Sequence, residues 1–155
     1  MTTLATPDRT LHLVDIENLV GGGVASHGDI DDAFARYLAL AHWEPGDLVY
    51  VAANPAFARE FVFDPPVPCN VHTAHGADGA DLALLVHAAP EFVSRRCTRL
   101  VIGSGDHIFI SRALQVRALD VGVVVVSRPE NVHGGWRAHG FPVLDLTVDD
   151  ERLAA

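Results

Sequence analysis

The sequence contains no lysine, so all 11 of its positively charged side chains are arginines, against 20 Asp and Glu residues. The formal net charge of -9 argues against a protein that coats nucleic acid by bulk electrostatics, because that mode of binding needs many Lys and Arg contacts to phosphates. An enzyme that acts on nucleic acid is not excluded. A carboxylate-rich site for divalent cations would itself contribute negative charge, which the bound ions would offset.

Cysteine is also scarce, since Cys69 and Cys97 are the only two and cannot form a disulfide framework. No apolar stretch approaches the roughly 20 residues of a membrane-spanning helix, and residues 1–10 lack the basic start and hydrophobic segment of a secretory signal. We therefore expect a cytoplasmic protein with reduced thiols and no membrane segment. A hydrophobic fraction of 49% excludes general disorder, and 155 residues suit a single domain over residues 1–155, with an ordered core at about 10–148.

Apolar segments typical of strands alternate with segments typical of helices. Strands are predicted at residues 11–15 and 121–126 and within 44–53, 64–74, 98–106 and 141–146. Helices are predicted in 28–43 with Asp29 as N-cap, in 54–63, from 78 at least to Ala89, in 110–118 and, shorter, in 130–140. This alternation indicates parallel pairing with right-handed crossovers, and hence a three-layer α/β/α fold around a mainly parallel sheet of five or six strands.

Acidic side chains follow three of these predicted strands. Ligands of open parallel sheets bind beyond the carboxyl ends of the strands, so these side chains should share one edge. Each aspartate singly could instead be a helix cap. Like charges in one cleft raise each other's pKa unless a cation stabilises them, and Mg²⁺ or Mn²⁺ suits oxygen ligands. The residues are Asp15, with Glu17 and Asn18 in the loop beyond it, then Asp78 and Asp81, and finally Asp106.

Three segments, "LVDIENLVGG", "GADGADLALL" and "LVIGSGD", resemble in their order and separation the NYN domain family of PIN-like metal-dependent ribonucleases. The resemblance implies a PIN-like fold and hydrolysis of RNA phosphodiester bonds, with metal ions that bind the scissile phosphate and activate water. It implies catalytic roles for Asp15, Asn18, Asp81 and Asp106. Asp15, Asp81 and Asp106 would ligate the metal, Asp78 would be an additional ligand, and Asn18 would orient a water or a phosphate.

The sequence departs from the family pattern at two positions. Many relatives carry a second aspartate two residues after the S-G-D aspartate, where this chain has Ile108. Many also carry another acidic residue one or two turns along the helix that begins near Asp78, where this chain has Val86 and His87. Unless Glu17 or Asp78 compensates, the site would hold one metal instead of two or be weakly active.

Further polar residues on the same edge are candidates for substrate binding. Ser104 would shape the turn or hydrogen-bond a neighbouring carboxylate, and His107 would donate a proton to the leaving oxygen, or else is a solvated residue of the first helical turn. The segment "SRPENVHGGWRAHG" offers Arg128, Trp136 and Arg137, which could hold phosphates and stack an unpaired base. The alternative for Trp136 is a packed side chain of a short surface helix.

Other constellations are weaker. His72, His75, Asp78 and Asp81 are spaced by three residues, which could suit a transition metal, but Gly76 and the preceding strand argue against one helical face. The sequence thus favours a ribonuclease that uses Mg²⁺ or Mn²⁺ on RNA, most simply single-stranded. A catalytically weak RNA-binding or protein-interaction module is the first alternative, and a phosphatase of small substrates is the second. A homodimer stays open beside a monomer.

Overall fold

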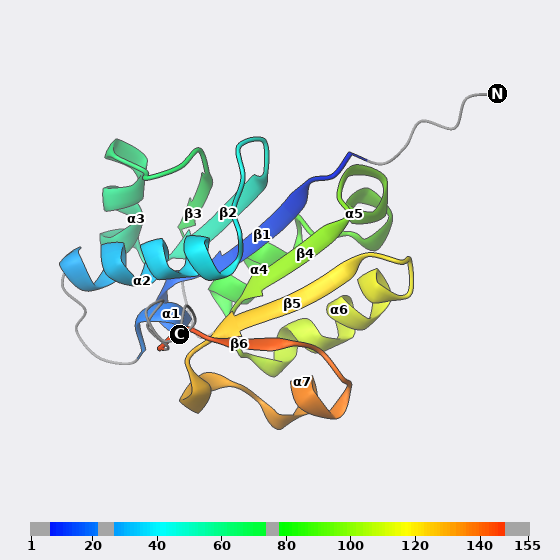
Figure 1. The fold of residues 1–155 in the computed structure, drawn as a ribbon. Helices are drawn as coiled ribbons and strands as arrows, with labels where there is room; N and C mark the ends of the chain where they lie inside the picture. Colours follow the sequence, from blue (N-terminus) through cyan, green and yellow to red (C-terminus); the bar gives the residue numbers. More distant parts are fainter. Residues whose placement is uncertain (1–6, 22–26, 74–77, 148–155) are drawn as a thin grey trace, which may run out of the picture.

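The computed structural model describes residues 7–21, 27–73 and 78–147, and six parallel strands form its single described sheet (Figure 1). The spatial order of the strands is β3-β2-β1-β4-β5-β6. This confirms the predicted three-layer α/β/α architecture with a parallel sheet. The strands are β1 (Thr10–Asp15), β2 (Leu48–Ala53), β3 (Asn70–Thr73), β4 (Arg99–Gly103), β5 (Gly122–Ser127) and β6 (Val143–Asp145).

Strand β1 lies at the point where the strand order reverses. It pairs with β2 on one side, where Asp15 faces Ala52 in the register, and with β4 on the other, where Val14 faces Gly103. From β1 the chain adds β2 and β3 in one direction, and from β4 it adds β5 and β6 in the other. The carboxyl ends of β1 and β4 therefore flank the topological switch point, where open parallel sheets bind their ligands.

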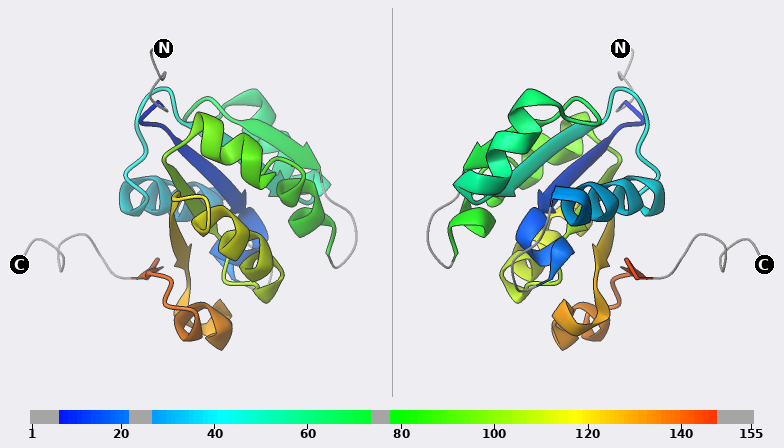
Figure 2. Two further views of the ribbon diagram at one scale, coloured as in Figure 1. Left: turned by 90° about the vertical axis from the view of Figure 1, so that its right-hand side faces the viewer. Right: turned by 90° about the vertical axis from the view of Figure 1, so that its left-hand side faces the viewer.

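Helices cover both faces of the sheet (Figure 2). One apolar core packs α1 (Ile16–Val20), α2 (His27–Leu40) and α3 (Pro55–Phe63) against one face, and the other packs the remaining α-helices against the opposite face. Short 3-10 turns η1 (His107–Phe109) and η2 (Pro129–Asn131) follow β4 and β5. The remaining helices are α4 (Gly79–Leu85), α5 (Pro90–Arg96), α6 (Ile110–Arg117) and α7 (Gly134–Ala138).

Three local predictions are corrected. The helix predicted to continue at least to Ala89 ends at Leu85, and a new helix begins at Pro90. Ala89 has an extended backbone, with ψ 127°, because the ring of the following proline disfavours the helical region there. Asp29 lies in the first turn of α2, which begins at His27, so it is not the N-cap. The short helix α1, after Asp15, was not predicted.

A buried polar network holds the α2 face of the sheet near its amino ends. The imidazole of His12 lies 2.9 Å from the Tyr37 hydroxyl through Nδ1 and 2.9 Å from the Asp47 carboxylate through Nε2. A neutral His12 satisfies both contacts when Nε2–H donates to Asp47 and Nδ1 accepts from Tyr37. Tyr37 packs so closely on Gly103 that a Cβ there would lie 2.9 Å from Cε2 of the ring. Within the described part of the chain, no helix is long and apolar enough to span a membrane.

Candidate functional site

Asp15, Asp81 and Asp106 reach one region of the switch point from three separate elements. Asp15 ends β1 and caps α1, its side chain accepting a hydrogen bond of 3.3 Å from the backbone N–H of Asn18. Asp81 is in the first turn of α4, a helix that contacts β1 and β2. Asp106 caps η1 beyond β4 and accepts 2.9 Å from the N–H of Ile108. The charge of Asp106 helps to raise the pKa of both Asp15 and Asp81, and the charge of Asp15 helps to raise that of Asp81.

Asp15 is 8% exposed, and its environment favours the protonated form. Burial raises the pKa of Asp15 to about 6, and the charges of Glu17 and Asp106 add to the rise. Hydrogen bonds from the backbone N–H groups of Asn18 and Glu17 act in the opposite direction because they favour the carboxylate. A carboxyl with a pKa near 6 is poised to exchange its proton for another cation close to neutral pH.

Asp81 has the smallest exposed fraction of the three and is incompletely satisfied. It is 4% exposed, and its Oδ1 is buried without a hydrogen-bond partner in the described part of the chain. Burial raises the pKa of Asp81 to about 7, followed by the charges of Asp15, Asp106 and Asp78 and by a hydrogen bond with Asp15 that favours the protonated form. An unpaired buried oxygen among like charges is a costly arrangement, which a cation would relieve.

Asp106 lies at the solvent side of this group, with two imidazoles beside it. Its side chain is 36% exposed, and Oδ1 lies 3.2 Å from Nδ1 of His107, whose side chain is 71% exposed. The His107 ring lies 5.2 Å from that of His133, the N-cap residue of α7. His133 belongs to the segment "SRPENVHGGWRAHG" after β5, which the sequence suggests as a phosphate-binding loop on the carboxyl edge. The two imidazoles line the rim of the carboxyl group rather than its buried part.

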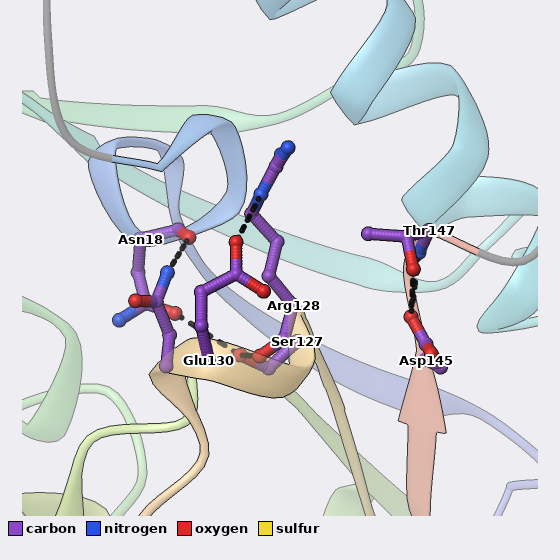
Figure 3. Close-up of polar contacts among 7 residues, drawn as sticks. Asn18, Ser127, Arg128, Glu130, Asp145 and Thr147 are labelled. Carbon is purple, nitrogen blue, oxygen red and sulfur yellow. Dashed lines mark hydrogen bonds and ion pairs between the residues drawn. The ribbon is translucent and has the colours of Figure 1, made fainter.

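Asn18 joins the loops after β1, β4 and β5. Its Oδ1 accepts 3.1 Å from the N–H of Gly105. The same oxygen accepts 3.3 Å from the hydroxyl of Ser127, and the backbone oxygen of Asn18 accepts 3.0 Å from the side-chain N–H of Asn131 (Figure 3). The amide oxygen of Asn18 thus holds the loops together, and the role that the resemblance implies for Asn18, orienting a water or a phosphate, stays a prediction. Ser127 and Asn131 were missed by sequence reasoning. Their signal was only their place after a buried strand.

Gly105, in the loop after β4, contacts the segment that follows β5. Its carbonyl oxygen accepts from the backbone N–H of His133 and from the indole N–H of Trp136, both at 3.0 Å. A Cβ at this position would overlap the backbone carbonyl of Asn131, so only glycine allows the two loops to approach so closely. The second glycine of "GSGD", Gly105, therefore allows the two loops to pack together. The turn that presents Asp106 is fixed from two sides, by Asn18 and by the segment that follows β5.

The predicted substrate-binding residues divide into buried and accessible ones. Trp136 is 0% exposed and packs edge-on against Phe141, with ring centroids 5.3 Å apart, so it cannot stack a base as predicted; its packed alternative is the one found. Ser104 is also 0% exposed, and its Oγ accepts 3.2 Å from the N–H of Asp106, in agreement with the turn-shaping role. His107 and Arg137 are exposed.

Arg128 has the position of a candidate phosphate contact but already has an acidic partner. Its side chain is 31% exposed and its Nε lies 3.3 Å from a carboxylate oxygen of Glu130 (Figure 3). The same side chain lies over Gly21, whose φ of 80° ends α1. Because Glu130 is 63% exposed, the pair is accessible to solvent, and a phosphate could compete for the guanidinium.

Four residues spaced by three in the sequence do not share a site as far as the structure describes them: His72, His75, Asp78 and Asp81. His72 stacks on Tyr50 and His87, Asp78 is exposed at the N-cap of α4, and His75 lies outside the described residues. Asp78 makes no side-chain cap bond and acts on Asp81 through its charge. A transition-metal site of the predicted kind is therefore not assembled from the three that can be placed.

The side chains of Asp15, Asp81 and Asp106, with Asp78 nearby, offer the oxygen ligands that a divalent cation prefers, and they would be its ligands. The charges of three carboxyls, those of Asp15, Asp106 and Asp78, act on Asp81, and one buried oxygen of Asp81 has no partner among the described residues. However, in residues 7–21, 27–73 and 78–147 no group of three or more His, Cys, Asp or Glu side chains is arranged closely enough to hold an ion as it stands. Cation binding would therefore require the carboxylates to draw together.

Comparisons of the chain with protein-family models, with curated proteins and with solved structures found no match. The resemblance to the NYN domain family consequently stays a prediction from three sequence segments.

Proposed function

We propose that the protein is a metal-dependent ribonuclease of the PIN-like, NYN type, with Asp15, Asp81 and Asp106 as ligands of Mg²⁺ or Mn²⁺ and Asp78 as a further carboxylate. The observation that carries the proposal is the buried, unpartnered oxygen of Asp81, in a helix beside the strand that ends in Asp15. Three loops around the switch point are hydrogen-bonded to one another, which supports a built site rather than three separate helix caps.

The residues of this chain would divide the work as follows. The bound metal supplies the polarisation of a scissile phosphate and the activation of water. Asp15, Asp81 and Asp106 hold the ion, and Asn18 keeps the turn of Gly105 in place so that Asp106 stays on the same edge. His107, His133 and Arg128 lie in or beside the loops after β4 and β5, and Arg137 is exposed on α7; these side chains could contact the phosphates of single-stranded RNA.

Cleavage of a labelled single-stranded RNA by the purified full chain tests the proposal. Cutting should require added Mn²⁺ or Mg²⁺, stop with a chelator, and fall at least about a hundredfold in Asp15→Asn and Asp106→Asn. Isothermal titration with Mn²⁺ should show binding to the wild type and weaker binding to both variants. Asp64→Asn, an exposed aspartate away from the site, is the matched control. Metal-independent cutting, or equal activity in all variants, would contradict the mechanism.

A catalytically weak RNA-binding or protein-interaction module is the second candidate. It is favoured by Ile108, which packs against the core where many relatives have an acid, and by the lack of a ready three-ligand group among the described residues. RNA binding that is measurable by fluorescence anisotropy without turnover at any metal concentration would support it. Hydrolysis of an aryl phosphate without RNA cleavage would instead indicate the small-substrate phosphatase.

A further inference from the structure

A second group of titratable side chains lies on the same sheet face as the carboxyls, over β2 and β3. The rings of Tyr50, His72 and His87 stack there. The His87 centroid lies 4.0 Å from that of Tyr50 and 4.6 Å from that of His72, with interplanar angles of 10° and 27°. Tyr50 and His72 are 6.2 Å apart and 18° from parallel. His87 therefore stacks on both sheet residues, and it does so from just beyond the end of α4.

This stack is a main anchor of α4. The helix has only seven residues and no side-chain hydrogen bond at its N-cap, and a helix of this length is not stable without tertiary contacts. Leu82 and Val86 on its outer side are 58% and 76% exposed, so they contribute little burial. Leu84 and Ala88 are buried in the core. The stacked His87 completes the attachment at the C-terminal end.

Positive charge on the stack has no compensation in the described structure. Neither His72 nor His87 forms an ion pair with a described residue, and Nε2 of His72 is buried without a hydrogen-bond partner among the described residues. Burial and the neighbouring His72 hold the pKa of His87 below its ordinary value. From α6, the guanidinium of Arg112 donates 2.7 Å and 3.1 Å to the carbonyl oxygens of Leu85 and Ala88, which adds another positive charge at this helix end.

The other groups that face the stack do not change this balance. Tyr50, from β2, contributes a neutral ring, and β3 contributes His72 itself. The carboxyls of Asp78 and Asp81 belong to the opposite end of α4. Protonation of one imidazole would therefore place a charge beside another imidazole and beside Arg112, in a half-buried position. Separation of the rings lets water solvate that charge.

We propose that the His72–His87 stack is a pH-sensitive latch that holds the C-terminal end of α4 on the sheet when the ring of His87 is neutral and releases it when acid protonates His87. Asp81 lies in the first turn of the same helix, so release of the helix end loosens the position of Asp81 against Asp15. In mildly acidic conditions this loosening acts against the protonation of Asp81, which favours its hydrogen bond with Asp15. The latch requires only the fold and does not depend on the ribonuclease proposal.

Hydrogen exchange measured by mass spectrometry between pH 5 and 8 tests the latch in the full chain. After correction for intrinsic exchange rates, the wild-type amides of residues 79–88 should lose protection as the pH falls below about 6.5, by about tenfold per pH unit at most. His87→Phe keeps a stacking ring without the imidazole, and its protection should not fall in acid, where protonation of Asp81 stabilises the helix. His72→Phe gives a second variant on another element. His139→Phe, at an exposed position of α7, should behave as the wild type.

The latch is overturned by any of three results. The wild type could keep constant protection of residues 79–88 down to pH 5, or both Phe variants could lose protection over the same pH range as the wild type. The amides of β4 and α6 could also lose protection together with those of α4, which would indicate global acid unfolding instead of local release. Retained protection in β4 and α6, with loss confined to residues 79–88 and absent from either Phe variant, supports it.

Discussion

The indole N–H of Trp136 donates a hydrogen bond of 3.0 Å to the carbonyl oxygen of Gly105, and this contact ties α7 to the turn that presents Asp106. Trp136→Phe removes the donor and leaves a smaller ring in a fully buried position. We expect a loss of roughly 2–4 kcal/mol in the free energy of unfolding, from the missing hydrogen bond and from the space left behind. Urea denaturation followed by circular dichroism measures it.

The matched change for this contact is Phe141→Leu, because Phe141 packs against the same indole but makes no hydrogen bond to the turn. Both variants lose packing, and only Trp136→Phe should also weaken Mn²⁺ binding. Equal Mn²⁺ affinity in the two variants at a temperature where both are folded would show that the bond does not position Asp106.

Gly105 and Gly134 give a second comparison in which one methyl group is added. At Gly105 a Cβ overlaps the backbone carbonyl of Asn131, whereas at Gly134 no atom lies within 4 Å of the added Cβ. Gly105→Ala must push the loops after β4 and β5 apart, so we expect a loss of about 1–3 kcal/mol and a lower melting temperature. Gly134 is the first residue of α7, so Gly134→Ala should be neutral or slightly stabilising. Equal melting temperatures would contradict the observed loop packing.

The fold was largely predictable because its signals are local and repeated. Short apolar runs such as "VGVVVV" alternate with helical periodicity, and that alternation alone favours a parallel sheet. The strand order was not predictable, since right-handed crossovers are compatible with several orders. The break between α4 and α5 was missed even though its signal was present: Pro90 forces Ala89 out of the helical region. The composition on both sides, rich in Ala and Leu, suggested one continuous helix instead.

The site was predictable as a place on the sheet, and less so in its details. Asp15 and Asp106 follow strands, so topology alone puts them on one edge. By contrast, the role of Asn18 depends on contacts with Gly105 and Ser127, far away in the sequence. Trp136 had two interpretations, and burial against Phe141 decided for packing. Long-range hydrogen bonds of this kind leave no local pattern, so they could not be inferred from the sequence.

Asp81→Asn should stabilise the metal-free protein at alkaline pH. The pKa of Asp81 is raised from 3.8 to about 7 in the fold, so between about pH 4 and 7 the native state holds a proton that the unfolded state has released. Stability from this group therefore falls as the pH rises through that window and stays low above it. The variant lacks the titration and should be more stable than the wild type by roughly 1–4 kcal/mol at pH 8, with the difference closing toward pH 4.

Denaturation curves at pH 4, 6 and 8 check the sign, with Asp64→Asn as an exposed control. Excess Mn²⁺ at pH 8 should raise the wild-type midpoint and leave Asp81→Asn nearly unchanged, because a ligand that binds only the native state stabilises it. A wild type more stable than Asp81→Asn at pH 8 without metal would show that the buried carboxyl is satisfied by a partner.

The His12–Asp47–Tyr37 network predicts a separate loss of stability in acid. Burial lowers the pKa of His12, so its contribution is complete above the unfolded value near 6.5 and is lost as the pH falls toward the native value. Burial alone would raise the pKa of Asp47, but hydrogen bonds from His12, Glu44 and Thr10 hold this pKa below its ordinary value. The contribution of Asp47 to stability is therefore lost only at lower pH.

Tyr37→Phe removes the hydroxyl that lies 2.9 Å from Nδ1 of His12, and we expect it to cost about 1–3 kcal/mol at pH 7, where that nitrogen is left buried and unpaired. The cost should shrink only as the pH falls through the native pKa of His12, which burial lowers below 6.5, because a protonated His12 no longer accepts a hydrogen bond at Nδ1. Tyr50→Phe removes a hydroxyl from a ring that keeps its stack on His87, and should change stability by less than about 0.5 kcal/mol. Urea midpoints of the two variants between pH 5 and 8 distinguish them, and a Tyr37→Phe cost that grows in acid would show that His12 is protonated in the native protein.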